Sequence, residues 1–361
     1  MSGVERLSRR GRYAQAVPGT AVGLIGSGKV GSRVLSRLAD QRPEGVTVVG
    51  LANSRRMLLA PGDLAAPDWK PRLAAAGARS DIERLAAHVG RQPHARHVIV
   101  DVTGSRAVAE RHPGWLADGF AIVTANKWAA CGPAASWARL DCSAYFDATT
   151  VGAGLPILDA LRALRRAGDR VERIDGVLSG TLSALLAEVA NGRSFADSLL
   201  RAHRDGLTEP DPRLDLGGMD VARKLVIAAR AGGLALELDE VEVQAWLDPD
   251  LAGLPLPAFL AAHRRIDDAW SGAVAAAPGQ GEMLCHVGEV ARTVDGAARA
   301  RVGLRRVSRL HPFAAIGAGE NIVAIHSAGY APKPIWIRGP GAGAGVTALQ
   351  ICAGLAATAR Q

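Results

Sequence analysis

The sequence predicts two domains, an α/β domain over residues 19–150 and an α+β domain over residues 151–340. In the first part, short apolar runs alternate with amphipathic stretches, a pattern typical of a parallel sheet with helices on both faces. In the second part, helical and strand patterns mix in the manner of an antiparallel sheet with helices on one face. The length of 361 residues is sufficient for two separate cores.

The first domain follows a polar, basic leader, residues 1–18, which we expect to be flexible and which lacks the apolar stretch of a secretory signal. Apolar runs predict strands at residues 21–25, 46–52, 97–102 and 120–124. Helical periodicity predicts helices at residues 30–40 and 106–118. This alternation predicts a doubly wound sheet.

The second domain has a less regular pattern. Helices are predicted near residues 156–167, 182–190, 195–204 and 218–231, and strands near 170–178, 282–290, 300–307, 321–328 and 334–337. A glycine-rich turn at 339–345 precedes a last helix, 346–360. We expect residues 341–361 to return to the first domain.

Composition narrows the class of protein. The net charge is +8, but the arginines are spread along the chain and form no basic block, so we expect anionic small molecules as ligands and neither nucleic acid nor a membrane. No apolar run approaches the roughly 20 residues that span a bilayer. Four cysteines without CxxC spacing argue against zinc and disulfides and favour the cytoplasm.

The segment Gly26-Ser-Gly-Lys-Val-Gly31 is the strongest cofactor signal. It follows a predicted strand and opens a predicted helix, the context in which GxGxxG binds a dinucleotide pyrophosphate. An ordinary strand-turn-helix connection is the alternative. The motif predicts a Rossmann-type domain with contacts to the cofactor from Gly26, Gly28, Val30 and Gly31.

The end of the second strand bears on the choice of nicotinamide cofactor. Residues 52–56 contain no carboxylate to hold a ribose 2′-hydroxyl, whereas Asn53, Ser54 and Arg55 can bind a hydroxyl or a phosphate. Arg56 is either a further phosphate ligand or a solvated charge. We therefore expect NADP to be preferred or at least accepted, with NAD as the alternative.

Two later strand ends contribute polar side chains to the same edge of the sheet. Thr103 and Ser105 follow one strand and are candidates for cofactor contacts, although a plain turn explains them equally well. Lys127 follows the next strand, where it faces the crevice toward substrate or nicotinamide, or else caps nearby carbonyl groups.

The segment 206–224 combines four carboxylates with a lysine at the start of a helix. Asp220 and Lys224 have i,i+4 spacing and therefore share one helical face. Only five of the 43 basic residues are lysines, and a lysine can lose its proton when desolvated, whereas an arginine cannot. Glu209 and Asp215 suit a cationic group such as an α-amine. A solvated acidic loop with a surface ion pair is an equally good interpretation.

A set of short motifs runs from about residue 20 to the carboxyl terminus: Ala52-Asn-Ser, Val100-Asp-Val-Thr, Ala125-Asn-Lys, Thr150-Val-Gly-Ala-Gly-Leu-Pro156, Leu178-Ser-Gly-Thr-Leu-Ser183, residues 206–224, Gly319-Glu-Asn321, Gly341-Ala-Gly and Val346-Thr-Ala348. In these motifs, and in their order and spacing, the chain resembles homoserine dehydrogenase.

The resemblance implies a set of roles by position. Lys224 corresponds to the catalytic lysine, and Glu209 and Asp220 correspond to groups that bind the amine and the hydroxyl of homoserine. Lys127 corresponds to a second active-site lysine. Backbone contacts around the nicotinamide are implied for Gly206, Gly341 and Gly343. A sodium ion is implied on the carbonyls of Ala148, Val151, Ala153 and Leu155, with the departure that family members often have Asp or Glu at position 148.

The resemblance further implies a homodimer with a Rossmann-type domain and an α+β catalytic and dimerisation domain. It also implies the short form, without an ACT or aspartate kinase domain. The expected reaction is the NAD(P)-dependent interconversion of L-homoserine and L-aspartate 4-semialdehyde. Two alternatives remain: a dehydrogenase of another amino-acid aldehyde or hydroxy acid, and a catalytically silent nucleotide sensor.

Overall fold

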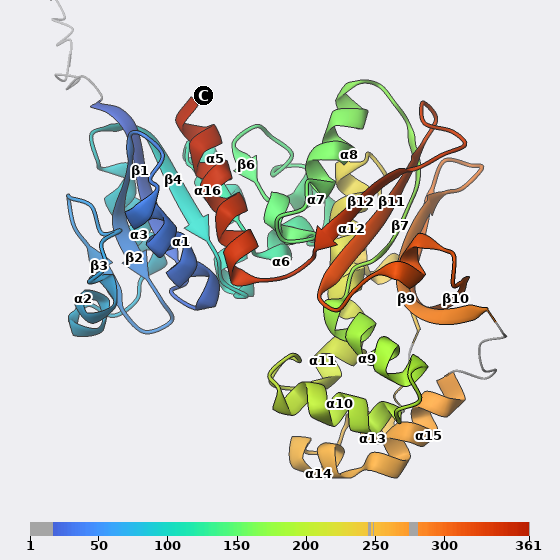
Figure 1. Cartoon of the computed structure of the whole chain (residues 1–361). Helices are drawn as coiled ribbons and strands as arrows, with labels where there is room; N and C mark the ends of the chain where they lie inside the picture. The colour runs from blue at the N-terminus through green and yellow to red at the C-terminus, as the bar shows by residue number, and fades with distance from the viewer. Residues whose placement is uncertain (1–16, 245–246, 248, 274–280, 361) are drawn as a thin grey trace, which may run out of the picture.

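The computed structural model describes residues 17–244, 247, 249–273 and 281–360. Residues 1–16 of the expected leader lie outside this range, and Val17 and Pro18 belong to the first strand. The fold contains two sheets, each with helices packed against it (Figure 1).

The first sheet has the order β3-β2-β1-β4-β5-β6. Its strands are β1 (Val17–Ile25), β2 (Val46–Ala52), β3 (Met57–Leu59), β4 (His94–Asp101), β5 (Ala121–Thr124) and β6 (Tyr145–Phe146). The associated helices are α1 (Lys29–Asp40), α2 (Trp69–Ala75), α3 (Ile82–Gly90), α4 (Arg106–Ala109), α5 (His112–Ala117), α6 (Lys127–Ala130), α7 (Ala134–Trp137) and the 3-10 helix η1 (Ala148–Thr150).

The doubly wound prediction is confirmed by the two faces of β1. Val22 and Leu24 are buried with residues of α1, whereas Ala21 and Ile25 are buried with residues of α3. Two details differ from the sequence prediction. β3 runs antiparallel to β2. The helix predicted at 106–118 is interrupted between α4 and α5, because Pro113, in the first turn of α5, lacks the N–H that a continuous helix requires.

The second sheet has the order β12-β11-β7-β9-β10-β8. Its strands are β7 (Val171–Val177), β8 (Val241–Val243), β9 (Glu282–Arg292), β10 (Ala298–Ser308), β11 (Glu320–Ser327) and β12 (Ile335–Pro340). The helices that follow β6 are α8 (Ile157–Arg166), α9 (Gly180–Ala190), α10 (Phe195–Arg204), α11 (Arg213–Leu216), α12 (Met219–Ala231), α13 (Pro249–Ala252), α14 (Leu256–Ala261), α15 (His263–Ala273) and α16 (Ala344–Arg360), with the 3-10 helices η2 (Leu238–Glu240) and η3 (Pro312–Ala315).

This second sheet is antiparallel except for β8, which pairs in parallel with β10. A separate helical layer is formed by α10, α13, α14 and α15 (Figure 1). The sequence predicted α10 but not α13, α14 or α15. It has its own core around Phe195, Phe259 and Trp270. The carboxyl-terminal helix α16 lies beside α1 and packs on the first sheet (Figure 1).

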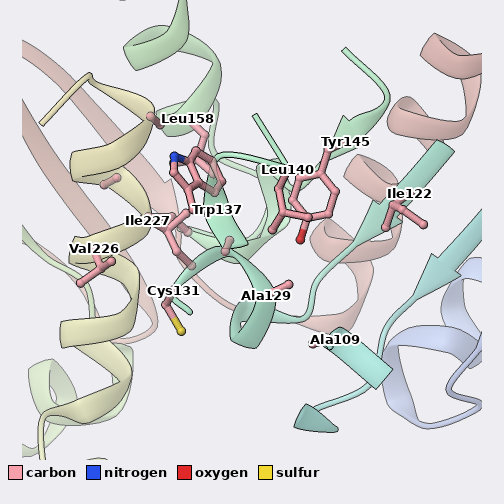
Figure 2. Packing of buried hydrophobic residues seen from close by; sticks show 14 of the residues in the cluster. Ala109, Ile122, Ala129, Cys131, Trp137, Leu140, Tyr145, Leu158, Val226 and Ile227 are labelled. Carbon is pink, nitrogen blue, oxygen red and sulfur yellow. The ribbon is translucent and has the colours of Figure 1, made fainter. Parts of the chain in front are cut away.

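One hydrophobic core joins the two parts of the molecule. Figure 2 shows Ile122 of β5 and Ala129 of α6 in the same buried cluster as Leu158 of α8 and Ile227 of α12, with Trp137 of α7 between them. α6 and α12 therefore share a packed interior, and these are the two helices that carry the candidate catalytic lysines.

Candidate active site

Three charged side chains meet where α6 faces α12. The Nζ atom of Lys224 lies 2.8 Å from Oδ2 of Asp220, and the Nζ atom of Lys127 lies 3.2 Å from Oδ1 of the same carboxylate. Lys224 also donates a hydrogen bond of 2.7 Å to the carbonyl of Leu178, which follows β7. The predicted i,i+4 pair is therefore formed, and the side chain of Lys224 is only 12% exposed. The lysine of this pair is therefore buried, whereas the carboxylate is 45% exposed.

The start of α12 determines where Asp220 and Lys224 point. Gly218 precedes the helix in a left-handed conformation with φ of 66°, where a side chain would be strained and would approach Val243 to 3.0 Å. The opposite face of α12 is apolar and buried, including Leu225 and Val226. Burial of that face directs Asp220 and Lys224 toward α6.

The electrostatics of this cluster favour a lysine that can lose its proton. Burial lowers the pKa of Lys224, and the neighbouring Lys127 ammonium lowers it further, while Asp220 opposes both effects. Burial also opposes ionisation of Asp220, but Lys224 and Lys127 outweigh it and hold the pKa of that carboxyl far below its usual range. Asp220 therefore stays ionised beside an amine whose pKa is lowered.

The acidic loop lines a pocket of about 570 Å³ next to this cluster. Asp215 accepts a 2.8 Å hydrogen bond from the backbone N–H of Glu209. Burial raises the pKa of Asp215, and its charge in turn raises that of Lys224, so the pocket and the lysine cluster are close neighbours. The Glu209 side chain is exposed. Gly206 turns the chain between α10 and this loop with φ of 68°.

The glycine motif forms the tight turn between β1 and α1. Gly26 has φ of 107°, and a Cβ on Gly31 would lie 1.8 Å from the carbonyl oxygen of Gly26. Both positions therefore require glycine. Gly28 caps α1 and has open space where a side chain would be, so its backbone is accessible to a ligand. Val30 instead packs against the core.

The turn after β2 separates the two arginines. The Asn53 Oδ1 atom accepts hydrogen bonds from the backbone N–H groups of Arg55 and Arg56, both at 2.8 Å, and so holds the turn. The Arg56 guanidinium donates to the carbonyl of Ala76. In the described part of the chain, the Arg55 guanidinium has no protein partner, and Ser54 beside it is exposed.

The polar groups after β4 hold one another. Asp101 is fully buried, and its Oδ1 accepts hydrogen bonds from the backbone N–H of Thr103 at 2.9 Å and from its hydroxyl at 2.7 Å. Thr103 in turn accepts from Ser105 N–H, and the Ser105 hydroxyl caps α4. The hydroxyl groups of Thr103 and Ser105 therefore stabilise the turn and the start of α4, in line with the plain turn given as the alternative. A contact of either residue with the cofactor stays a prediction.

The loop with the expected sodium ligands has a constrained backbone. Ala153 adopts a left-handed conformation with φ of 53°, directly after Gly152 with φ of 75°. The carbonyl of Leu155 accepts from Ile157 N–H, whereas the carbonyls of Val151 and Ala153 accept no hydrogen bond from any described residue. Both residues are buried. Ala148 lies in η1 at the start of this loop.

The glycine turn before α16 packs against β11. A Cβ on Gly341 would lie 2.0 Å from the side chain of Asn321, so only glycine fits. Gly343 has φ of 126° and leads into α16. The structure thus places this turn beside the end of β12, where the chain crosses from the second sheet to the first.

Family comparisons agree with this architecture. Residues 156–355 match the family model for homoserine dehydrogenase, and residues 26–145 match that for the homoserine dehydrogenase NAD binding domain. The homoserine dehydrogenase of Emericella nidulans is 33% identical over 362 residues, covering 92% of this chain and 96% of that relative.

The chain belongs to the homoserine dehydrogenase family. This confirms both the resemblance and the predicted fold class. A bifunctional aspartokinase/homoserine dehydrogenase of Zea mays is 36% identical over 351 residues, covering 91% of this chain but only 37% of the maize protein. The chain therefore spans just over a third of the length of such bifunctional relatives. A hyperthermophilic archaeal homoserine dehydrogenase solved in complex with NADPH has the same fold, with a TM-score of 0.69, 21% identity, and coverage of 92% of this chain and 94% of that one.

Within this homoserine dehydrogenase fold, sequence reasoning missed several groups around the site. Lys29, inside the glycine motif, lines the same pocket as Glu209, and Thr181 of α9 lines it too. Asn126 and Arg230 hold α6 from its two ends. The position of Lys29 in a phosphate-binding motif was a usable signal. For Arg230 there was none, because the acceptors that link it to α6 are backbone carbonyls about a hundred residues away in sequence.

Three further findings hold for the part of the chain that the structure describes. No helix in this part of the chain has both the length and the apolar character to cross a membrane. No cluster of three or more His, Cys, Asp or Glu side chains suitable for a metal ion is present there. All four cysteines are free thiols.

Proposed function

We propose that this chain catalyses the NADP-preferring interconversion of L-homoserine and L-aspartate 4-semialdehyde, a step in threonine, methionine and isoleucine biosynthesis. The observation that carries the proposal is Lys224, a buried lysine 2.8 Å from Asp220 and beside a pocket with acidic walls. An amine in such a place is suited to exchange a proton with the oxygen of a bound alcohol or aldehyde.

The chemistry divides between the cofactor and the protein. A bound nicotinamide supplies or accepts the hydride at the carbon that carries the oxygen. In the direction of aldehyde reduction, protonated Lys224 stabilises the negative charge that develops on the oxygen and then donates its proton. In the direction of oxidation, neutral Lys224 accepts the hydroxyl proton. Asp220 orients Lys224, and Lys127 adds positive charge near the same oxygen.

Substrate recognition is assigned to the pocket walls. Glu209 and Asp215 bind the α-ammonium group of homoserine, and Asp220 also contacts its hydroxyl. Lys29 of the glycine motif lines the same pocket as Glu209 and Asp215. We assign to it an anionic oxygen of either the substrate carboxylate or the cofactor phosphate.

The first sheet fits a dinucleotide. Gly26 and Gly31 permit the tight turn, and Gly28 leaves open space at the amino end of α1, where a pyrophosphate is stabilised by oriented N–H groups. Near the ribose, Arg55 is proposed to bind the 2′-phosphate because its guanidinium has no partner among the described residues, while Asn53 and Ser54 add polar contacts. Gly206, Gly341 and Gly343 are assigned backbone contacts with the nicotinamide, Lys127 lies near that end, and Val30, Thr103 and Ser105 complete the proposed set.

Further parts of the proposal concern assembly and ions. A sodium ion is proposed on the carbonyls of Ala148, Val151, Ala153 and Leu155. The support comes from Val151 and Ala153, because these two buried residues have carbonyls that accept no hydrogen bond from any described residue, and such oxygens suit a hard cation. We also propose a cytoplasmic homodimer. Its chain divides near residue 150 into a cofactor domain, to which residues 341–361 return, and a catalytic domain.

A spectrophotometric assay tests the function directly. Purified protein is mixed with L-homoserine and NADP, and absorbance of the reduced cofactor is followed, with NAD, L-serine and 4-hydroxybutyrate as comparisons. Rapid reduction that requires both the α-amine and the four-carbon chain supports the proposal. Preference for another hydroxy acid would favour the related-dehydrogenase alternative. Cofactor binding without turnover on any substrate would favour the nucleotide sensor.

A further inference from the structure

The short helix α6 is held at its carboxyl end by a residue of α12. Arg230 is 4% exposed, and its Nη1 atom donates to the carbonyl of Ala130 at 2.9 Å and to that of Gly132 at 2.6 Å. These are the last residue of α6 and the second residue after it. A helix of four residues forms few hydrogen bonds of its own, so its geometry depends on such external donors.

The remaining donors of Arg230 fix the guanidinium itself. Its Nε atom donates to the carbonyl of Leu236 at 3.0 Å, and Nη2 donates to the Glu237 carboxylate at 2.8 Å. Glu237 also accepts from the backbone N–H of Ala134 at the start of α7. The planar fork of an arginine therefore connects α12, the end of α6 and the start of α7 in one rigid arrangement.

The amino end of α6 is held by a buried asparagine. Asn126, 1% exposed, accepts from Trp128 N–H at 3.1 Å and so caps the helix. Its Nδ2 atom donates to Asp101 Oδ2 and to the carbonyl of Ser105, both at 2.8 Å. Lys127 is the first residue of the helix between these two attachments.

The side of α6 also contacts α12. The guanidinium of Arg223 lies 4.3 Å from the centre of the Trp128 ring, a cation–π distance. Figure 2 shows Ala129 of α6 in the same buried cluster as Val226 and Ile227 of α12. α6 thus packs on the helix that carries Asp220, Lys224 and Arg230.

We propose that Arg230 is a positioning residue: it fixes the Lys127 helix against α12 and thereby sets how Lys127 and Lys224 share the Asp220 carboxylate. This inference rests on the proposed function of that site. Its consequence is that both lysines are held relative to α12. The distance between them is therefore independent of the glycine-motif turn between β1 and α1.

The charged groups that face Lys224 give the inference a measurable signature. They are Asp220 from its own helix, Asp215 from α11 and Lys127 from α6. After burial, repulsion by Lys127 contributes to the lowered pKa of Lys224. If α6 is released, Lys127 moves away from Asp220 and this repulsion weakens. The pKa of Lys224 then rises, and homoserine oxidation needs a more alkaline pH.

The experiment is a double-mutant cycle on the full chain with Arg230→Met, Lys127→Met and both together. Arg42→Met is the matched control, because Arg42 also donates to backbone carbonyls and a carboxylate, at the far end of α1. For Arg230→Met we expect kcat to fall about 10- to 100-fold while the Kd for NADP stays within about twofold. The pH profile of oxidation should move to higher pH. The double variant should be no more than about threefold slower than Lys127→Met alone, because both changes remove the same positioned group.

Other outcomes overturn the inference. Losses that multiply in the double variant, or an Arg230→Met enzyme with normal kcat and pH profile, would leave Arg230 with a structural role only. If Arg230→Met does not fold, Arg230→Lys, which keeps the charge but not the planar fork, decides by the same readouts: an intermediate kcat with a shifted profile supports the inference, and a normal profile rejects it. A wild-type protein that is inactive on homoserine would instead reject the proposed function.

Discussion

Replacing Lys224 with alanine removes an ammonium group that contacts both Asp220 and the carbonyl of Leu178. The change should leave the fold intact. Asp220 is 45% exposed and keeps Lys127 at 3.2 Å, so its carboxylate is not stranded in an apolar interior. We therefore expect a thermal midpoint close to that of the wild type and unchanged affinity for NADP.

The catalytic loss can be judged from the same geometry. A positioned general acid or base contributes about 10²- to 10⁴-fold, or about 3–5 kcal/mol at 1.36 kcal/mol per tenfold. Lys127 contacts the other oxygen of Asp220, so it stabilises some of the charge but is not placed to replace Lys224 in proton transfer. We therefore expect kcat to fall by about 10³-fold or more.

The assay is steady-state turnover in both directions over a range of pH. Burial lowers the pKa of Lys224, so wild-type oxidation should increase with pH below the ordinary lysine range, and reduction should decrease over the same interval. The alanine variant should lose this dependence. Lys70→Ala serves as the control, because Lys70 is a lysine of α2 outside the site. Turnover of Lys224→Ala within about tenfold of wild type, with the pH profile retained, would show that another group exchanges the proton.

Three further changes probe the rest of the site. Asp215→Asn should stabilise the fold at neutral pH, because burial raises the pKa of Asp215 and its ionised form is therefore disfavoured in the folded state. This gain in stability should vanish at a pH low enough to protonate the carboxyl in both the folded and the unfolded state. The same change should increase KM for homoserine. Arg55→Ala should weaken NADP binding about 10- to 100-fold and leave NAD nearly unaffected, as measured by fluorescence titration. Lys29→Met should increase KM for homoserine if Lys29 binds the substrate carboxylate, or the Kd of NADP if it binds phosphate, and unchanged values of both would refute its assignment.

The parts of the fold that the sequence predicted are those with a local signal. The second strand and the helix at 195–204 have the predicted bounds, because one is a continuous apolar run and the other a capped amphipathic helix. Local patterns failed where tertiary contacts decide. The prediction of one helix at 106–118 did not take Pro113 into account. The strand β8 was not predicted, because it is only three residues long and is stabilised by its pairing with β10.

The candidate site was predictable to the same extent. The spacing of Asp220 and Lys224 already placed them on one helical face, and the glycine motif identified the turn at β1. Their surroundings were not predictable. Asn126 and Arg230 act through buried backbone carbonyls and a carboxylate that only the tertiary fold brings within reach, and such acceptors leave no pattern in the sequence.

The division between lysine and arginine on α12 follows from proton chemistry. Lys224 and Arg230 are six residues apart, and both are largely removed from water. Burial lowers the pKa of each. For a guanidinium this shift starts from so high a value that Arg230 stays charged, and four acceptors keep it in place. For an ammonium group the same environment makes the neutral form accessible. One helix can therefore hold a permanent charge suited to fixing geometry and a removable one suited to proton transfer. On the proposed roles, exchanging the two residue types should abolish both.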